Sequence, residues 1–168
     1  MLRYHDIQHN TILQGTGLRV ALFVSGCDKE PKCKGCHNAI AWDKNSGIPF
    51  DNNAKQEIFE QLDKDYIAGT TFLGGEPLAT YNVNEVTELA KEIKEKYPNK
   101  NIWCYTGKTW EDIKHLSIMQ YIDVLIDGEF IEELADVKYP FAGSTNQRVI
   151  DVQESLKHNK IVLWQDKK

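Results

Sequence analysis

Short apolar runs alternate along the chain with stretches whose apolar residues recur at helical spacing. The runs are rich in β-branched and aromatic residues, and they predict buried strands at residues 19–25, 70–73, 101–106 and 122–126. Apolar residues recur at helical spacing after Asp51, a predicted N-cap, and again from residue 83 until Pro98. Both stretches are predicted to be helices. Weaker patterns predict two more helices, at residues 110–116 and 153–158, and two more strands, at residues 149–152 and 161–164. Strands and helices therefore alternate over most of the chain.

This alternation predicts an α/β fold of right-handed βαβ units, with a mainly parallel sheet that is open or curled into a partial barrel. We expect residues 1–168 to form a single domain, because this length suits one hydrophobic core. Ligands of such folds bind at the carboxyl ends of the strands. Residues 26–38, 74–77 and 127–128 each follow a predicted strand, so we expect these segments to converge on one site.

The charge and the chain start narrow the class of protein. A formal net charge of −5, from 20 Lys and Arg against 25 Asp and Glu, argues against broad binding of nucleic acid. The first ten residues lack the apolar core of a secretory signal, and the chain has no run of about 18 apolar residues. We therefore expect a cytoplasmic protein without a membrane span. Because that compartment keeps thiols reduced, the cysteines are expected to be metal or redox ligands rather than disulfides.

Three of the four cysteines lie within ten residues of one another. Five residues separate Cys27 from Cys33 and two separate Cys33 from Cys36, so three thiolates can bind one centre. Three thiolates suit a [4Fe–4S] cluster whose fourth iron stays open to an external ligand. Cys104 stands alone in a predicted strand, where an ordinary half-buried cysteine is expected.

Two alternatives remain for the cysteines. A Cys3His zinc site would take His37 or His115 as its fourth ligand and would make the protein a zinc-stabilised binding module. The three residues could also be unligated buried thiols, although the charged residues between them are unusual for a core segment. A simple electron carrier is disfavoured, because it needs a fully ligated cluster.

A glycine turn with an acid follows the strand predicted at residues 70–73. Gly74 and Gly75 would let a ligand approach the backbone, and Glu76 could accept hydrogen bonds from an ammonium group. Taken alone, Gly-Gly-Glu-Pro is more often a tight turn between two elements. The nearby cysteines favour the ligand-binding interpretation.

Further motifs accompany the cysteines and the glycine turn. They are Gly-Cys-His-Asn at residues 35–38, Trp-Cys-Tyr-Thr-Gly at 103–107, Ile-Asp-Gly at 126–128 and Gly-Ser-Thr-Asn-Gln-Arg at 143–148. Together these residues resemble the radical S-adenosylmethionine superfamily, in which three cysteines follow the first strand and Gly-Gly-Glu follows the second. Within it the chain most resembles the activases of anaerobic ribonucleoside-triphosphate reductase, a glycyl-radical enzyme. The motif at residues 143–148 is the most discriminating.

The resemblance implies an incomplete radical-SAM-type βα barrel that reductively cleaves S-adenosylmethionine on a [4Fe–4S] cluster and generates a glycyl radical on the reductase. Cys27, Cys33 and Cys36 would bind the cluster, and no side chain would act as catalytic acid or base. Residues 74–76 would hold the methionine ammonium, while Gly35 and His37 would line the adenosine side. Asp127 would bind ribose hydroxyls or, alternatively, cap a turn or helix. The partners implied are the large subunit of the reductase and a reductant such as flavodoxin.

The chain departs from that family at the cysteines. The family pattern has three residues between the first two cysteines, whereas this chain has five. Lengthening a surface loop by two residues costs little entropy, so we retain the ligand assignment. The alternative enzymes are a pyruvate formate-lyase type activase and a 7-carboxy-7-deazaguanine synthase, and the motif around Asn146 and Arg148 disfavours both. Those two residues are expected either to orient the partner or to form a structural turn.

Overall fold

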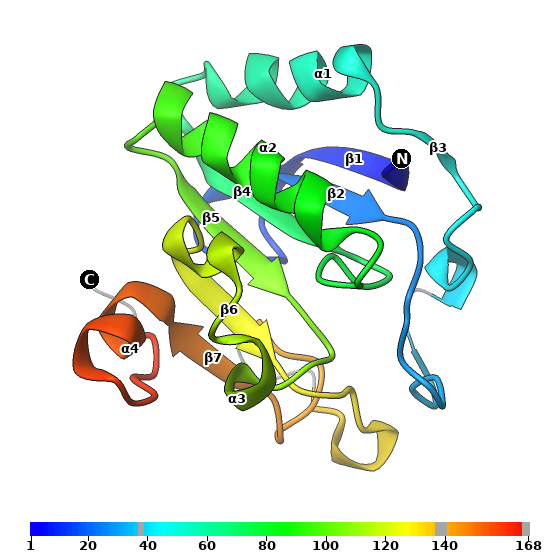
Figure 1. Ribbon diagram of the computed structural model, residues 1–168. Helices are drawn as coiled ribbons and strands as arrows, with labels where there is room; N and C mark the ends of the chain where they lie inside the picture. Colours follow the sequence, from blue (N-terminus) through cyan, green and yellow to red (C-terminus); the bar gives the residue numbers. More distant parts are fainter. Residues whose placement is uncertain (37–38, 137–140, 166–168) are drawn as a thin grey trace.

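The computed structural model describes residues 1–36, 39–136 and 141–165. Within them one sheet has the strand order β3-β1-β2-β4-β5-β6-β7. The strands are β1 (Arg3–Thr11), β2 (Leu18–Val24), β3 (Ile48–Pro49), β4 (Ile67–Gly74), β5 (Asn101–Tyr105), β6 (Val124–Asp127) and β7 (Arg148–Asp151). The sheet is open, with β3 at one edge and β7 at the other (Figure 1).

The centre of the sheet is parallel, as the alternation of strands and helices predicts. Strands β2, β4, β5 and β6 pair in parallel, whereas β1, β3 and β7 add antiparallel edges. The α/β class and the mainly parallel sheet are therefore confirmed. The strand expected at residues 161–164 is wrong: only an isolated bridge between Leu163 and Ile150 forms there.

The helices follow the predicted order. They are α1 (Asn52–Leu62), α2 (Val83–Lys96), α3 (Trp110–Ile113) and α4 (Val152–His158), with single 3-10 turns η1 (Ala39–Ala41), η2 (Ser117–Gln120) and η3 (Glu132–Leu134). Asp51 caps α1 as expected, because its carboxylate accepts a hydrogen bond from the Ala54 N–H (3.0 Å). Pro98 follows the end of α2, since proline cannot continue a helix.

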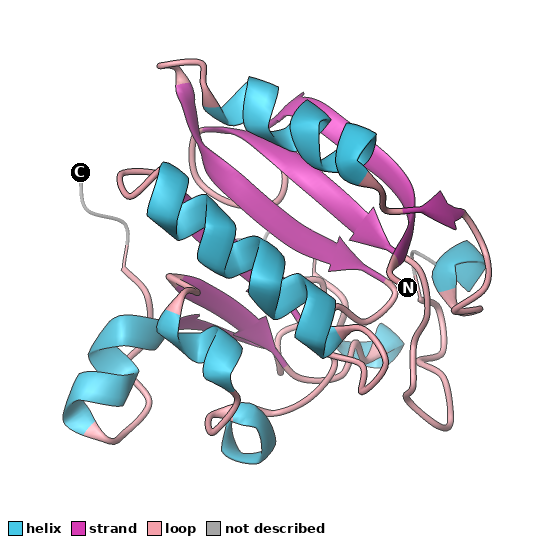
Figure 2. Cartoon of the chain, turned by 45° about the horizontal axis from the view of Figure 1, so that its top comes forward, coloured by secondary structure: helices cyan, strands magenta, loops and turns pink. Residues whose placement is uncertain are grey.

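The main core lies between the helices and one face of the sheet (Figure 2). Alternate residues of the strands, such as Leu22, Phe72 and Ile102, pack against the apolar faces of α1 and α2. The opposite face carries a smaller aromatic cluster in which Trp103 packs edge-on against Phe141 and Trp164. No helix among the described residues is both long and apolar enough to cross a membrane.

Candidate metal centre

The polar segments after β2 and β4 meet at the carboxyl end of the sheet. β2 and β4 end side by side, with Val24 paired to Gly74. The Gly75 N–H donates to the Val24 carbonyl (3.0 Å), and the Glu76 N–H donates to the Gly26 carbonyl (2.6 Å). The predicted convergence of the cysteine segment with the glycine turn is thus confirmed.

The two glycines make that close approach possible. A Cβ built on Gly75 would lie 2.3 Å from the Gly26 carbonyl oxygen, and one on Gly74 would lie 2.4 Å from the Val24 nitrogen. Gly74 also has a φ of +125°, which side chains with a Cβ rarely adopt. The end of β2 fills the space beside Gly74, and the backbone of Gly26 and Ala41 fills the space beside Gly75.

The described part of the cysteine loop, residues 26–36, is held by polar contacts within the loop and with other segments of the chain. The Lys32 ammonium donates to the carbonyls of Cys27 and of Lys29 (2.9 Å). Asp28 accepts from the Thr80 N–H (3.1 Å) and pairs with Lys108 (3.2 Å). The long spacer between Cys27 and Cys33 is therefore folded back onto the molecule.

The three cysteines of the loop are partly buried free thiols. Burial raises the pKa of Cys27 and of Cys33; at Cys33 the backbone N–H of Phe130 and the charge of Lys29 act in the opposite direction. Within the described residues no three His, Cys, Asp or Glu side chains are arranged to hold a metal ion. The ligand assignment stays a prediction, and three soft sulfur donors on one loop are chemically suited to an iron–sulfur cluster.

Cys104 differs from the other three. It is fully buried on β5, and burial raises its pKa well above the ordinary value. It packs within the main core and is thus more deeply buried than the half-buried position expected from the sequence. Cys104 is therefore a core residue.

Glu76 is a buried carboxylate at the centre of the site, with only 3% of its side chain exposed. One oxygen, Oε2, accepts from the Leu78 N–H (3.0 Å) and the Thr106 hydroxyl (2.8 Å), and Oε1 accepts from the Gly107 N–H (2.7 Å). Burial raises the pKa of Glu76, although these three donors and Lys108 lower it in part. Glu76 thereby ties the end of β4 to the loop that follows β5.

Asp127 lies at the end of β6 with 1% of its side chain exposed. It accepts from the Trp110 N–H at the start of α3 (2.8 Å) and is bound by two nitrogens of Arg148, at 3.0 and 2.5 Å. Arg148 also pairs with Glu111 (2.7 Å), and these two acids raise the pKa of the guanidinium. These contacts support the alternative that Asp127 caps a helix; its role in ribose binding stays a prediction.

Gly35 and His37 flank the third cysteine. Gly35 has a φ of +73°, and a Cβ on it would lie 2.9 Å from Cδ of Glu132. His37 lies outside the described residues, so its predicted contact with adenosine also stays a prediction.

Sequence reasoning missed two neighbours of the cysteine loop. The first is Glu129, just beyond the predicted segment 127–128, which forms an ion pair with Lys29 (3.2 Å). The second is Tyr81, whose ring fills the space over Gly26, within 2.6 Å of a Cβ built there. Burial first, then the nearby Asp28 and Cys27, raises the pKa of Tyr81 to about 12. No sequence motif marks either neighbour, because both reach the loop only through the fold.

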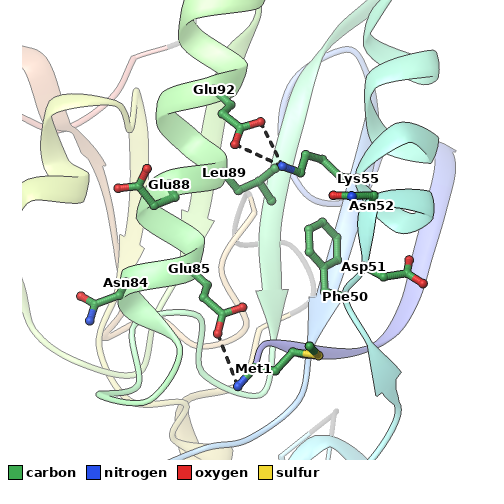
Figure 3. A pocket seen from close by; sticks show the side chains of 10 residues that line it. All are labelled: Met1, Phe50, Asp51, Asn52, Lys55, Asn84, Glu85, Glu88, Leu89 and Glu92. Atoms are coloured by element: carbon green, nitrogen blue, oxygen red, sulfur yellow. Dashed lines mark hydrogen bonds and ion pairs between the residues drawn. The ribbon is translucent and has the colours of Figure 1, made fainter.

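A groove away from the cysteine loop lies between α1 and α2. Figure 3 shows it lined by Met1, Phe50, Leu89 and a rim of charged residues, including an ion pair between Lys55 and Glu92 (3.1 Å). It shares no lining residue with the cysteine loop or the glycine turn.

Comparison with known proteins agrees with the chemistry of the cysteine loop. A family model described as a 4Fe-4S single cluster domain matches residues 13–150, a range that includes all three cysteines of the loop. The sheet from β2 to β7 lies almost entirely within that range.

Similar curated proteins share one name. The anaerobic ribonucleoside-triphosphate reductase-activating protein of Enterobacteria phage T4 is 40% identical over 148 residues, covering 88% of this chain and 93% of its own length. The proteins of that name from Haemophilus influenzae and Escherichia coli K12 are 37% and 36% identical; the alignments cover 87% and 88% of this chain and 96% and 97% of theirs. The chain belongs to the family of anaerobic ribonucleoside-triphosphate reductase-activating proteins.

Proposed function

We propose that this protein is a radical S-adenosylmethionine activase that generates a glycyl radical on anaerobic ribonucleoside-triphosphate reductase. The observation that carries the proposal is the junction of the cysteine loop with the Gly-Gly-Glu turn, made by the hydrogen bond from the Glu76 N–H to the Gly26 carbonyl. The names of the relatives and the 4Fe-4S family match support the same conclusion.

Cys27, Cys33 and Cys36 would hold a [4Fe–4S] cluster, which when bound supplies the electron for cleavage of S-adenosylmethionine. The other residues of the site would bind and orient S-adenosylmethionine. Glu76 Oε1 accepts one hydrogen bond where Oε2 accepts two, so Oε1 keeps capacity for the methionine ammonium. Gly74 and Gly75 place that carboxylate directly beside the loop.

The adenosine side of the site would be formed by Gly35 and His37. Asp127 enters the proposal chiefly as a positioning residue, because both its oxygens already bind Trp110 or Arg148. Ribose hydroxyls would reach it only if these contacts rearranged. No side chain is required to transfer a proton.

We also propose the domain organisation, the cellular compartment and the partners of the protein. Residues 1–168 would act as one domain whose open sheet corresponds to an incomplete βα barrel. Free thiols suit the reducing cytoplasm, where a flavodoxin-type protein would supply the electron and the large subunit of the reductase would be the partner.

The test compares Cys33→Ala with Cys104→Ala. Each protein is reconstituted with iron and sulfide without oxygen, analysed for both elements, reduced with dithionite and supplied with S-adenosylmethionine; 5′-deoxyadenosine is then quantified. We expect wild type and Cys104→Ala to release it and Cys33→Ala to release none, because Cys104 is a core residue and Cys33 is a proposed ligand. A glycyl-radical signal on the added reductase, detected by electron paramagnetic resonance, identifies the partner.

Two results would contradict the proposal. One is a wild-type protein that carries a full cluster and cleaves no S-adenosylmethionine. The other is a colourless protein that takes up zinc and no iron, as the Cys3His alternative predicts.

A further inference from the structure

The motif at residues 143–148 holds the backbone that follows β6. The Asn146 side-chain amide donates to the Glu129 carbonyl (2.8 Å), and the Gln147 amide donates to the Gly128 carbonyl (3.0 Å). Ser144 accepts from the Ile131 N–H (3.2 Å) through its hydroxyl. Three side chains of one short motif thus fix three backbone groups of residues 128–131.

Gln147 is itself held firmly. Its Oε1 accepts from the N–H groups of Gly143 (2.8 Å) and Ser144 (3.1 Å), and 9% of the side chain is exposed. The hydrogen bonds to Oε1 therefore fix the orientation of the Gln147 amide, whose nitrogen donates to the Gly128 carbonyl.

The segment that the motif holds touches the cysteine loop at three points. Glu129 pairs with Lys29, in the spacer between the first two cysteines (3.2 Å). The backbone N–H of Phe130 lowers the pKa of Cys33 against the effect of burial, and Glu132 fills the space over Gly35. Residues on both sides of the second cysteine are contacted from one segment.

We propose that Asn146 and Gln147 are positioning residues for the cysteine loop, acting through residues 128–132. The hydrogen bonds described above join Asn146 and Gln147 to the backbone of other residues and not to a cysteine. They hold the segment from which Glu129 pairs with Lys29 and Glu132 covers Gly35, and whose Phe130 N–H acts on Cys33. Hydrogen bonds to sulfur are one of the means by which a protein sets the potential of an iron–sulfur cluster, so this part of the inference rests on the proposed function.

The competing interpretation is a turn that only stabilises the fold, and a matched pair of isosteric variants separates the two. Gln147→Glu keeps the acceptor for Gly143 and Ser144 and removes the donor to Gly128. Gln153→Glu removes a similar donor, which binds the Met119 and Ile122 carbonyls under α4 (3.0 and 2.8 Å).

The first measurement is amide hydrogen exchange, followed by mass spectrometry, on the full-length reduced protein before iron is added. We expect Gln147→Glu to speed exchange in residues 128–132 and also in residues 27–36, by roughly two- to tenfold, the range for one lost hydrogen bond. Gln153→Glu should leave residues 27–36 unchanged.

The second measurement is the midpoint potential of the reconstituted cluster. It should become more negative in Gln147→Glu and stay at the wild-type value in Gln153→Glu, because only the first variant loosens the segment whose Phe130 N–H acts on Cys33. If Gln147→Glu does not fold, Asn146→Ala, at an exposed position, serves in its place.

Faster exchange confined to residues 128–147, with residues 27–36 unchanged, would overturn the inference and leave a structural turn. The exchange result does not depend on the cluster. If the wild type binds no iron but the exchange pattern is as expected, the proposed function fails while the coupling between motif and loop stands.

Discussion

The helix-covered face of the sheet and the carboxyl end of its parallel strands are held together by different forces. Under α1 and α2 the contacts are apolar, as between Ile93 and its neighbours in the main core. At the carboxyl end the contacts are polar and directional: Glu76 and Gln147 each bind backbone groups of other segments. Apolar burial provides most of the stability, whereas directional bonds fix the positions of loops.

The carboxyl end of the sheet carries a cost in folding free energy that the apolar core does not. Glu76 and Asp127 are buried acids, and burying a polar group costs free energy that its hydrogen bonds must offset. The main core has no such cost. The carboxyl end of the sheet therefore holds groups that a purely structural edge would leave exposed, which is typical of a functional site.

The largest effect is expected in the core. Ile93 on α2 is fully buried, so Ile93→Ala should lower the free energy of unfolding by about 2–5 kcal/mol through lost burial and a residual cavity. Urea denaturation measures it. Leu156→Ala on α4 is the control, because 40% of that side chain is exposed and the loss should be far smaller. Equal losses for the two variants would mean that the main core is not centred under α2.

The next effect is expected at the carboxyl end. Arg148→Ala would leave the buried Asp127 with the Trp110 N–H as its remaining described partner and should destabilise the protein by about 2–3 kcal/mol. The value is below that for a fully buried pair, since 34% of the Arg148 side chain is exposed. Arg148→Lys should recover part of the loss. Urea unfolding that shows no loss for the alanine variant would refute the assigned role of the pair.

Most of the sheet could be predicted from the sequence because buried parallel strands and amphipathic helices have strong periodicity. β1 was missed, because Ile7 is its only buried residue and the rest of the strand is polar. β3 is only two residues long and exposed. The strand expected at residues 161–164 has the right composition, but a single bridge to β7 is all that forms.

The site was predicted in part for a similar reason. The cysteines, the glycine turn and Asp127 stand at strand ends, a position that sequence patterns reveal. What sequence could not show is that Glu76 and Asp127 are occupied by contacts within the chain, or that Glu129 reaches Lys29. Such contacts join residues up to 100 positions apart, and only the topology of the sheet brings them together.

A smaller effect concerns pH at the same end of the sheet. Because burial raises the pKa of Glu76 above its ordinary value of 4.5, the folded state favours the protonated acid. The stability from this group is complete below pH 4.5 and is lost as the pH rises through the folded pKa. The free energy of unfolding should therefore fall more steeply from pH 4.5 to 7 in wild type than in Glu76→Gln. Parallel curves from denaturation at several pH values would contradict this.

The smallest effect is expected on the surface of the helix layer, where Lys55 on α1 pairs with Glu92 on α2 (Figure 3). The Glu92 side chain is 43% exposed, so water screens the pair, and Lys55→Ala should cost about 0.2–1 kcal/mol. The loss should shrink further in 1 M salt, where the Debye length is about 3 Å. Urea denaturation at low and high salt tests this. A loss that is large and independent of salt would show that the two helices depend on this ion pair rather than on the apolar core beneath them.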